Sequence, residues 1–333
     1  MKKKKILVTG GAGFIGSHLV EKAIHDGHDV VVIDDLSVGR RSNLKEVEGP
    51  QLSFLQADVA DLEKIAPYFD GVDWVFHLAA RADIVPSIQM PMVYHRANVD
   101  GTIAVLEAAR AAKVKRFVYA ASSSCYGLAT QFPTPETAPI SPQYPYALTK
   151  WLGEQMVLHW EKVYGIPALS LRFFNVFGPR GRTCGTYGAV FGVFLAQKRH
   201  GKPLTVVGDG TQTRDFTYVS DVVEALWMAM ESSITGEVMN VGSGGSYSVN
   251  ELVRLIGGET ISIPKRPGEP DCTFADISRI RERLGWTPKV AFADGVKKLL
   301  EQLELWQEAP VWTPEKIAQA TLDWFKYLGR RTV

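Results

Sequence analysis

The segment Ile6-Leu7-Val8-Thr9-Gly10-Gly11-Ala12-Gly13-Phe14-Ile15-Gly16 joins an apolar, β-branched run to closely spaced glycines. The run predicts a buried strand, the glycines predict a tight turn, and the pattern over 14–26 predicts a helix directly after it. Glycines allow a backbone to approach a pyrophosphate closely, and the free N–H groups at a helix N-terminus attract an anion. The segment therefore predicts a strand, a turn and a helix that bind the pyrophosphate of a dinucleotide.

The next predicted strand places an acid where it selects the dinucleotide. This strand, over 30–33, is followed by Asp34, whose carboxylate can accept both ribose hydroxyls of an adenosine and repels a 2′-phosphate. NAD is therefore favoured over NADP, with Arg40 and Arg41 as the opposing signal. Asp58 follows the third strand, where it either contacts the adenine or caps a helix.

Short β-branched runs alternate with helical patterns through the first half of the chain, as in a parallel sheet covered by helices on both faces. The expected fold class is therefore α/β, a doubly wound (Rossmann) parallel sheet with a smaller C-terminal substrate lobe. After residue 176 the rhythm loosens into Gly- and Pro-containing loops, although 237–241 reads as one more strand. The other expected strands are 6–9, 30–33, 52–55, 74–78, 117–121 and 168–173, and the expected helices are 14–26, 92–112 and 146–164.

These patterns divide the chain into three parts. Residues 1–176 are expected to form the dinucleotide-binding domain, with 215–243 returning to it. Residues 177–214 and 244–312 are expected to form the smaller lobe, and 313–333 a helical extension.

The extension has its own helix start signal. Thr313 is placed as the N-cap, Pro314 at the first helical position and Glu315 in the first turn. A single helix is expected to follow, with one apolar face docked on the parent domain. That face comprises Ile317, Ala320, Thr321, Trp324, Phe325 and Leu328.

Charge and cysteine content restrict the partners. The 37 Lys and Arg against 36 Asp and Glu leave a net charge of +1, which gives no bulk attraction to nucleic acid or a membrane surface. No apolar stretch approaches the ~20 residues that span a bilayer. Cys125, Cys184 and Cys272 are too far apart for a C-x-x-C metal site, and an odd number is a poor disulfide framework. A cytoplasmic protein with a small-molecule partner and no metal is expected.

Tyr146 and Lys150 lie four residues apart, hence on one face of the helix predicted over 146–164. A phenol with a pKa of ~10 needs about 4 kcal/mol of anion stabilisation to act as a base near neutral pH. An ammonium group ~4 Å away supplies about that much at an effective dielectric constant of ~20. Taken alone, such a pair is more often a packed tyrosine beside a solvated lysine.

The order of the motifs resembles that of the extended short-chain dehydrogenases/reductases, and in particular their nucleotide-sugar epimerase branch, as far as about Leu300. The resemblance implies a UDP-sugar 4-epimerase, in which Tyr146 removes the sugar 4-OH proton while the C4 hydride passes to NAD. The 4-ketose then turns over and takes the same hydride back. The motifs are Thr9-Gly10-x-x-Gly13-x-x-Gly16, His77-Leu78-Ala79-Ala80, Asn98, Ser122 and the Tyr146 and Lys150 pair.

The same resemblance assigns the two ligands to residues of this chain. Tyr146, Lys150 and Ser122 are the implied catalytic residues, with the Ser122 hydroxyl on the reacting sugar oxygen. NAD is assigned to Gly10, Gly13, Phe14, Ile15, Gly16, Asp34, Asp35, Asp58, Val59, Leu78, Ala79, Ala80, Asn98, Tyr146, Lys150 and Phe174. The UDP-sugar is assigned to Arg81, Ser122, Ser123, Ser124, Tyr146, Asn175, Val190, Arg214, Arg266, Glu269 and Thr273.

Individual roles follow from the resemblance for the substrate residues. Asn175, Arg214 and Arg266 are implied to hold the diphosphate, since guanidinium groups suit phosphate oxygens, and Glu269 the uridine ribose. Thr273 falls beside the sugar 2-substituent, where its small size leaves space for an N-acetyl group. Arg81 either meets a uronate carboxylate or is a solvated loop residue.

Other activities on this scaffold leave different signatures. The 4,6-dehydratases require an Asp-Glu pair where this chain has Ser123 and Ser124, and uronate decarboxylases carry a Glu at the position of Ser124. Both activities are therefore disfavoured. UDP-glucuronate 4-epimerisation, a reductase and a 3,5-epimerase remain open, whereas a non-catalytic dinucleotide sensor has no use for the Tyr and Lys pair. The helices near 92–112 and 147–164 resemble those that pair into an intersubunit four-helix bundle, which implies a homodimer.

Overall fold

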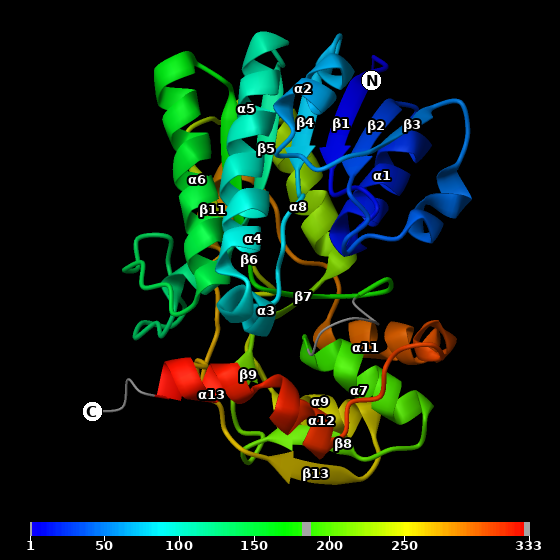
Figure 1. The fold of residues 1–333 in the computed structure, drawn as a ribbon, viewed down its shortest axis with the longest axis vertical. Helices are drawn as coiled ribbons and strands as arrows, with labels where there is room; N and C mark the ends of the chain where they lie inside the picture. Colours follow the sequence, from blue (N-terminus) through cyan, green and yellow to red (C-terminus); the bar gives the residue numbers. More distant parts are fainter. Residues whose placement is uncertain (1, 182–187, 330–333) are drawn as a thin grey trace.

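A seven-stranded parallel sheet forms the upper part of the molecule (Figure 1). The structure is a computed structural model that describes residues 2–181 and 188–329. The strand order is β11-β6-β5-β4-β1-β2-β3, so the expected doubly wound sheet and its strands are confirmed, including the strand predicted at 237–241. The strands are β1 (Lys5–Thr9), β2 (Asp29–Asp34), β3 (Leu52–Gln56), β4 (Trp74–His77), β5 (Arg116–Ser122), β6 (Ala168–Phe173) and β11 (Val238–Val241).

Alternate residues of the strands enter two separate cores, because successive side chains of a strand point to opposite faces. Val8 and Val32 pack with α1 (Phe14–His25) and α8 (Val219–Glu231). Leu7 and Val31 pack on the other face, with α5 (Gly101–Ala111) and α6 (Pro145–Tyr164). Strand β1 lies between β4 and β2, and the crevice at the carboxyl ends of such strands is where ligands bind in doubly wound folds.

The helix predicted over 92–112 is one continuous helical segment with an irregular middle. A turn of π-helix joins α4 to α5, and the short helix α3 precedes them. The bounds of these elements are α3 (Ile84–Gln89), α4 (Pro91–His95) and the π-helical η3 (Arg96–Asp100). The other short helical elements of the sheet domain are α2 (Leu62–Ile65) and the 3-10 segments η1 (Arg41–Val47), η2 (Ala66–Phe69) and η4 (Ser123–Tyr126).

A smaller lobe lies below the carboxyl end of the sheet (Figure 1). It contains three two-stranded ribbons, β7 with β10, β8 with β13 and β9 with β12. These ribbons join segments far apart in the sequence and were not predicted. The bounds of the ribbons and of the helices in the second half of the chain are β7 (Asn175–Phe177), α7 (Val190–Arg199), β8 (Leu204–Val207), β9 (Thr213–Arg214), β10 (Phe216–Tyr218), β12 (Tyr247–Ser248), α9 (Val249–Ile256), β13 (Thr260–Ile263), α11 (Phe292–Leu300), η5 (Leu303–Trp306) and α10 (Ser278–Leu284), which packs against β11 of the main sheet.

The C-terminal extension is two short helices, α12 (Pro314–Ala320) and α13 (Leu322–Leu328), so the prediction of a single helix was wrong. Thr313 caps α12 as expected, by accepting a hydrogen bond from Lys316 N. Thr321 leaves helical geometry at φ −99° and ψ 5°, while its hydroxyl donates to the Ile317 carbonyl at 2.8 Å. Because the helix breaks at Thr321, the residues of the predicted apolar face do not all face the protein. Ile317, Thr321 and Trp324 are buried, but Phe325 is exposed. Residues 330–333 of the predicted extension lie outside the described residues.

None of the helices in the described ranges is both long and apolar enough to cross a bilayer.

Candidate active site

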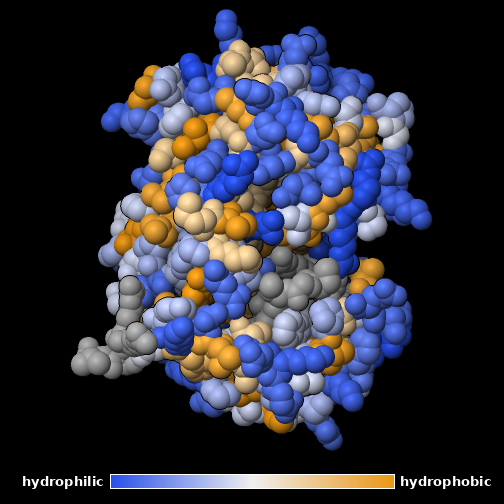
Figure 2. Space-filling model, viewed as in Figure 1, coloured by the Kyte–Doolittle hydropathy of each residue, from blue (hydrophilic) through white to orange (hydrophobic). Residues whose placement is uncertain are grey.

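A cavity of about 620 Å³ lies between the carboxyl end of the sheet and the smaller lobe. In Figure 2 the molecular outline is notched at the level where the two parts meet. All the residues assigned above to NAD or to the UDP-sugar line this cavity, with the exception of Asn98. Segments separated by more than half of the chain therefore meet in one space.

The glycine loop after β1 leaves room for a pyrophosphate. A Cβ on Gly10, which has a φ of +70°, would lie 2.7 Å from Ala79 N, and a Cβ on Gly16 would collide with Gly10 O. The N-cap of α1 is Gly13, which has no side chain that could cap the helix. The first amides of α1 have no partner within the helix, so they are available to an anion in the cavity.

The Asp34 carboxylate is fixed by two backbone amides. Its Oδ2 accepts from Ala12 N at 3.0 Å, and its Oδ1 accepts from Leu36 N at 2.9 Å. Burial raises the pKa of Asp34, and these two hydrogen bonds oppose that shift. Each carboxylate oxygen retains acceptor capacity for a ribose hydroxyl.

Asp58 also lines the cavity, but it does not cap a helix. Its Oδ2 lies 3.0 Å from Arg96 Nε, and its Oδ1 accepts from Ala60 N at 2.9 Å. The cap of α2 is instead Asp61, which accepts from Lys64 N. Of the two roles predicted for Asp58, the helix cap is therefore wrong.

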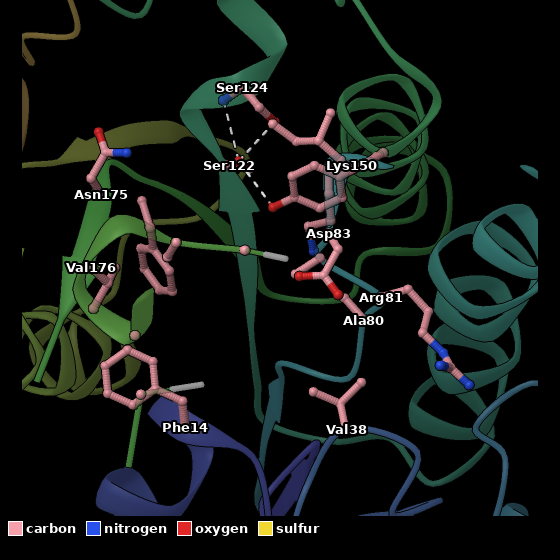
Figure 3. Close-up of a pocket in the computed structure, with 18 of the residues that line it drawn as sticks. Phe14, Val38, Ala80, Arg81, Asp83, Ser122, Ser124, Lys150, Asn175 and Val176 are labelled. Carbon is pink, nitrogen blue, oxygen red and sulfur yellow. Dashed lines mark hydrogen bonds between the residues drawn. The ribbon is translucent and has the colours of Figure 1, made fainter. Parts of the chain in front are cut away.

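Ser122, Tyr146 and Lys150 all line the cavity, and Figure 3 shows Ser122 and Lys150 on the same side of it. Ser122 is the last residue of β5, whereas Tyr146 and Lys150 lie one turn apart at the start of α6. The Tyr146 hydroxyl donates to Ser122 Oγ at 3.3 Å. Ser122 Oγ also lies 2.8 Å from Ser124 Oγ and accepts from Ser124 N at 3.2 Å. The hydroxyl groups form a short chain that ends at the phenol.

Burial dominates the electrostatics of this group. It lowers the pKa of Lys150 to about 7, against the opposing effect of Glu154. Burial also raises the pKa of Tyr146, and the hydrogen bond with Ser122 opposes that shift. The Lys150 ammonium lies 4.3 Å from the centroid of the Tyr119 ring. The pKa of the phenol is therefore raised by burial in this cavity, and not lowered as the spacing predicted.

Asn98, which the resemblance assigned to NAD, is not among the residues that line the cavity. It is 1% exposed and sits on the π-helical turn. Its Nδ2 donates to the Arg81 carbonyl at 3.0 Å and to Thr149 Oγ1 at 2.9 Å, and its Oδ1 accepts from Arg81 N at 2.8 Å. Asn98 thus ties the loop after β4 to α6, which carries the reactive side chains.

Arg81 lines the cavity and pairs with an acid at its cofactor end. Its side chain extends away from Ser122 and Lys150 in Figure 3. Its Nη2 lies 3.9 Å from Asp35 Oδ2, at the cofactor end.

The smaller lobe brings two arginines and one acid together. Arg214 Nη2 donates to Glu269 Oε1 at 3.0 Å, and Arg266 Nη1 lies 3.7 Å from Glu269 Oε2. Asn175 Oδ1 accepts from Thr273 Oγ1 at 2.9 Å. Two guanidinium groups beside an amide suit an anionic ligand such as a diphosphate.

Several lining residues were not predicted as site residues. The ring of Tyr144 stacks on that of Tyr146, with centroids 6.3 Å apart and planes 6° apart. Trp306 and Trp324 line the cavity from the end of the chain. The only signal for Trp324 was its place on the apolar face of the extension, which indicated docking but gave no location.

A buried histidine supports the glycine loop. His77 Nδ1 lies 2.6 Å from Thr9 Oγ1, and its Nε2 lies 3.0 Å from Thr102 Oγ1. Burial lowers the pKa of His77 to about 3, so the ring is neutral at physiological pH. Thr9 Oγ1 in turn accepts from Ala79 N, which fixes the two loops against each other. Among the described residues no group of three His, Cys, Asp or Glu side chains could hold a metal ion.

A family model described as the NAD dependent epimerase/dehydratase family matches residues 6–242. A UDP-glucose 4-epimerase of Mycolicibacterium smegmatis is 38% identical over 307 residues, which cover 89% of this chain and 97% of that protein. A crystal structure of UDP-glucose 4-epimerase with UDP-glucose from Thermotoga maritima has a TM-score of 0.85 at 34% identity and covers 91% and 99% of the two chains. A UDP-glucuronic acid 4-epimerase of Bacillus cereus with UDP-glucuronic acid and NAD has a TM-score of 0.83 at 33% identity and covers 90% and 99%.

Proposed function

Because the chain belongs to the NAD-dependent epimerase/dehydratase family, we propose that it inverts carbon 4 of a UDP-sugar, either UDP-glucose and UDP-galactose or the N-acetylhexosamine pair. The observation that carries this proposal is the Tyr146 to Ser122 hydrogen bond beside Lys150. This group lies in the cavity between the glycine loop and the two arginines of the smaller lobe.

The cofactor end of the cavity fits NAD. The glycine loop and the amides of α1 suit its pyrophosphate, and Asp34 suits the adenosine ribose. When bound there, NAD accepts a hydride from the sugar and returns it, and its oxidised ring adds positive charge to the cavity. Tyr146 and Lys150 line the same space, where that charge offsets the effect of burial on the phenol.

The residues of the chain divide the proton transfer between them. The Ser122 hydroxyl holds the sugar 4-oxygen, and Tyr146 Oη takes its proton, as their mutual hydrogen bond allows. The positive charge of the Lys150 ammonium stabilises the phenolate form of Tyr146, and this form must be present before the proton is transferred. After the 4-ketose has presented its other face, Tyr146 gives the proton back to the same oxygen.

The substrate residues are proposed by the same reasoning. Arg214, Arg266 and Asn175 hold the diphosphate, and Glu269 the uridine ribose, which places UDP in the lobe formed by 177–214 and 244–312. Thr273 is small and contacts Asn175, so it leaves space for an N-acetyl group at carbon 2. No carboxylate replaces Ser123 or Ser124 beside the Tyr146 hydroxyl, which argues against dehydration.

Turnover of three substrates in heavy water tests this function. UDP-glucose, UDP-N-acetylglucosamine and UDP-glucuronate are incubated with the protein without added NAD and followed by proton NMR. Inversion at carbon 4 without deuterium is expected, because the hydride never exchanges with solvent. Tyr146→Phe is expected to lose about 10²- to 10⁴-fold in kcat. Deuterium at carbon 3 or 5, or equal rates for both proteins, would exclude the mechanism.

We also propose that two copies of the chain associate through α4, α5 and α6. Helix α6 packs against α4 and α5, and its outer surface exposes Leu148, Val163 and Tyr164. Met92 and Val93 are exposed on α4. Apolar side chains exposed on neighbouring helices favour a self-complementary contact.

A cytoplasmic location is proposed as well. Cys125 and Cys272 are free thiols, which suits a reducing compartment. Cys184 lies outside the described residues.

A further inference from the structure

The C-terminal helix α13 forms part of the wall of the substrate cavity. Trp324 is 3% exposed and lines the cavity. Its ring centroid lies 6.4 Å from that of Tyr144, which stacks on Tyr146. A segment added after the family core therefore reaches the neighbourhood of the reactive phenol.

Trp324 contacts the loop that carries Arg266, which is proposed to bind the substrate diphosphate. Its Nε1 donates to the Pro267 carbonyl at 2.7 Å. The guanidinium carbon of Arg266 lies 5.4 Å from the centroid of the indole ring. A guanidinium over an aromatic face is held by the ring quadrupole, so the indole restricts where Arg266 can point. Since the indole N–H is already used, Trp324 offers no polar group to a substrate.

The helix is fastened on its other side to the sheet domain. Gln89 Nε2, at the end of α3, donates to Asp323 Oδ2 at 3.0 Å. Helices α13 and α3 pack together, and Figure 1 shows α13 below the level of α3, with α12 in front of the smaller lobe. Before it, Gln197 Nε2 donates to the Trp312 carbonyl at 2.7 Å. The extension thus connects the two parts that enclose the cavity.

We propose that Trp324 is a positioning residue for Arg266, and that α13 holds the 266–269 loop in the geometry that binds a nucleoside diphosphate. This inference rests on the proposed function, which makes Arg266 a substrate contact. Glu269 competes for the same guanidinium, at 3.7 Å. Without the indole, Arg266 is expected to move closer to that carboxylate and away from the diphosphate.

Calorimetric titration with UDP tests the inference without requiring turnover. Trp324→Ala is expected to bind UDP about tenfold more weakly, since both the cation–π contact and the loop hydrogen bond are lost. Trp324→Phe keeps an aromatic face, and its affinity for UDP is expected to lie between those of the native protein and Trp324→Ala. Phe325→Ala removes the exposed neighbouring ring and is the matched control, with unchanged affinity expected.

Two further readouts separate positioning from damage to the fold. NAD affinity is expected to be equal in all four proteins, and in turnover KM for the UDP-sugar is expected to rise with little change in kcat. Equal UDP affinity of Trp324→Ala and the native protein would overturn the inference, as would an equal loss in Phe325→Ala or a parallel loss of NAD binding. If the native protein binds UDP but inverts none of the three sugars, the proposed function fails while this inference stands. If it does not bind UDP, both fail.

Discussion

The position of the Asp34 carboxylate depends on a glycine five residues away. A Cβ on Gly39 would lie 2.8 Å from both carboxylate oxygens. Gly39→Ala is therefore expected to displace the carboxylate and to weaken NAD binding about tenfold. A fluorescence titration with NAD measures this. Gly49→Ala is the control, because nothing lies within 4 Å of its added methyl group; equal affinities of the two variants would contradict the role of Asp34.

Lys150 is expected to lower the stability that the fold would otherwise have. Its folded pKa of about 7 is below the unfolded value, so the unfolded chain binds more protons between these two values. The free-energy cost of holding the charged Lys150 in the fold is largest below pH 7, and it declines as the pH rises toward the unfolded pKa of about 10.4. In protein freed of nucleotide, Lys150→Met should raise the free energy of unfolding by about 2 kcal/mol at pH 6 and by less at pH 10.

Denaturant titrations of both proteins at the two pH values provide the check. A gain that is independent of pH would show that the lysine is not charged at a cost in the folded state. Activity should be lost in Lys150→Met at every pH, because the phenolate then has no ammonium beside it.

Spacing along the chain predicted some side chains of the site and not others. Tyr146 and Lys150 share a face because they are one helical turn apart, whereas Ser122, at the end of a buried strand, was assigned only through the resemblance. Asn98 and Arg81 depend on tertiary contacts, namely the amide bridge between them and the ion pair with Asp35, which no local pattern encodes.

Helix α6 can approach the sheet because it has a glycine at the contact. A Cβ on Gly153 would collide with the Tyr119 hydroxyl and lie 2.9 Å from the Asn98 carbonyl. Gly153→Ala should therefore push α6 outward, with a loss of about 2 kcal/mol in stability. Because α6 carries Tyr146 and Lys150, kcat should fall more than the affinity for NAD. Chemical denaturation together with initial rates measures both, and a native rate would show that the helix position is not critical.

The elements that the sequence pattern predicted correctly are those with strong local signals. The strands of the main sheet are continuous apolar runs, since both of their faces are buried. The ribbons of the smaller lobe are two to four residues long and pair across long stretches of chain, so periodicity cannot identify them. The break at Thr321 was missed because a threonine in an amphipathic pattern does not by itself end a helix.

At the scale of the whole molecule, the cavity is made of residues whose proximity only the fold creates. Motif order placed the glycine loop, Tyr146 and the two arginines in one site through the resemblance to a family. Trp324 belongs to a segment outside that family core, so neither motif nor resemblance could connect it with Arg266. The fold was therefore predictable to a greater extent than the substrate wall.

The proposed association of two copies can be tested by one substitution that introduces a charge into the proposed interface. Val163 is 53% exposed near the end of α6, away from the reactive side chains at the start of that helix. In a twofold contact, Val163→Glu places two carboxylates in an apolar interface, so light scattering at micromolar protein should give the mass of a monomer where the native protein gives that of a dimer. Leu305→Glu, at a side chain 50% exposed on the other lobe, should leave the dimer intact. A native monomer, or dissociation by both substitutions alike, would remove α6 as the interface.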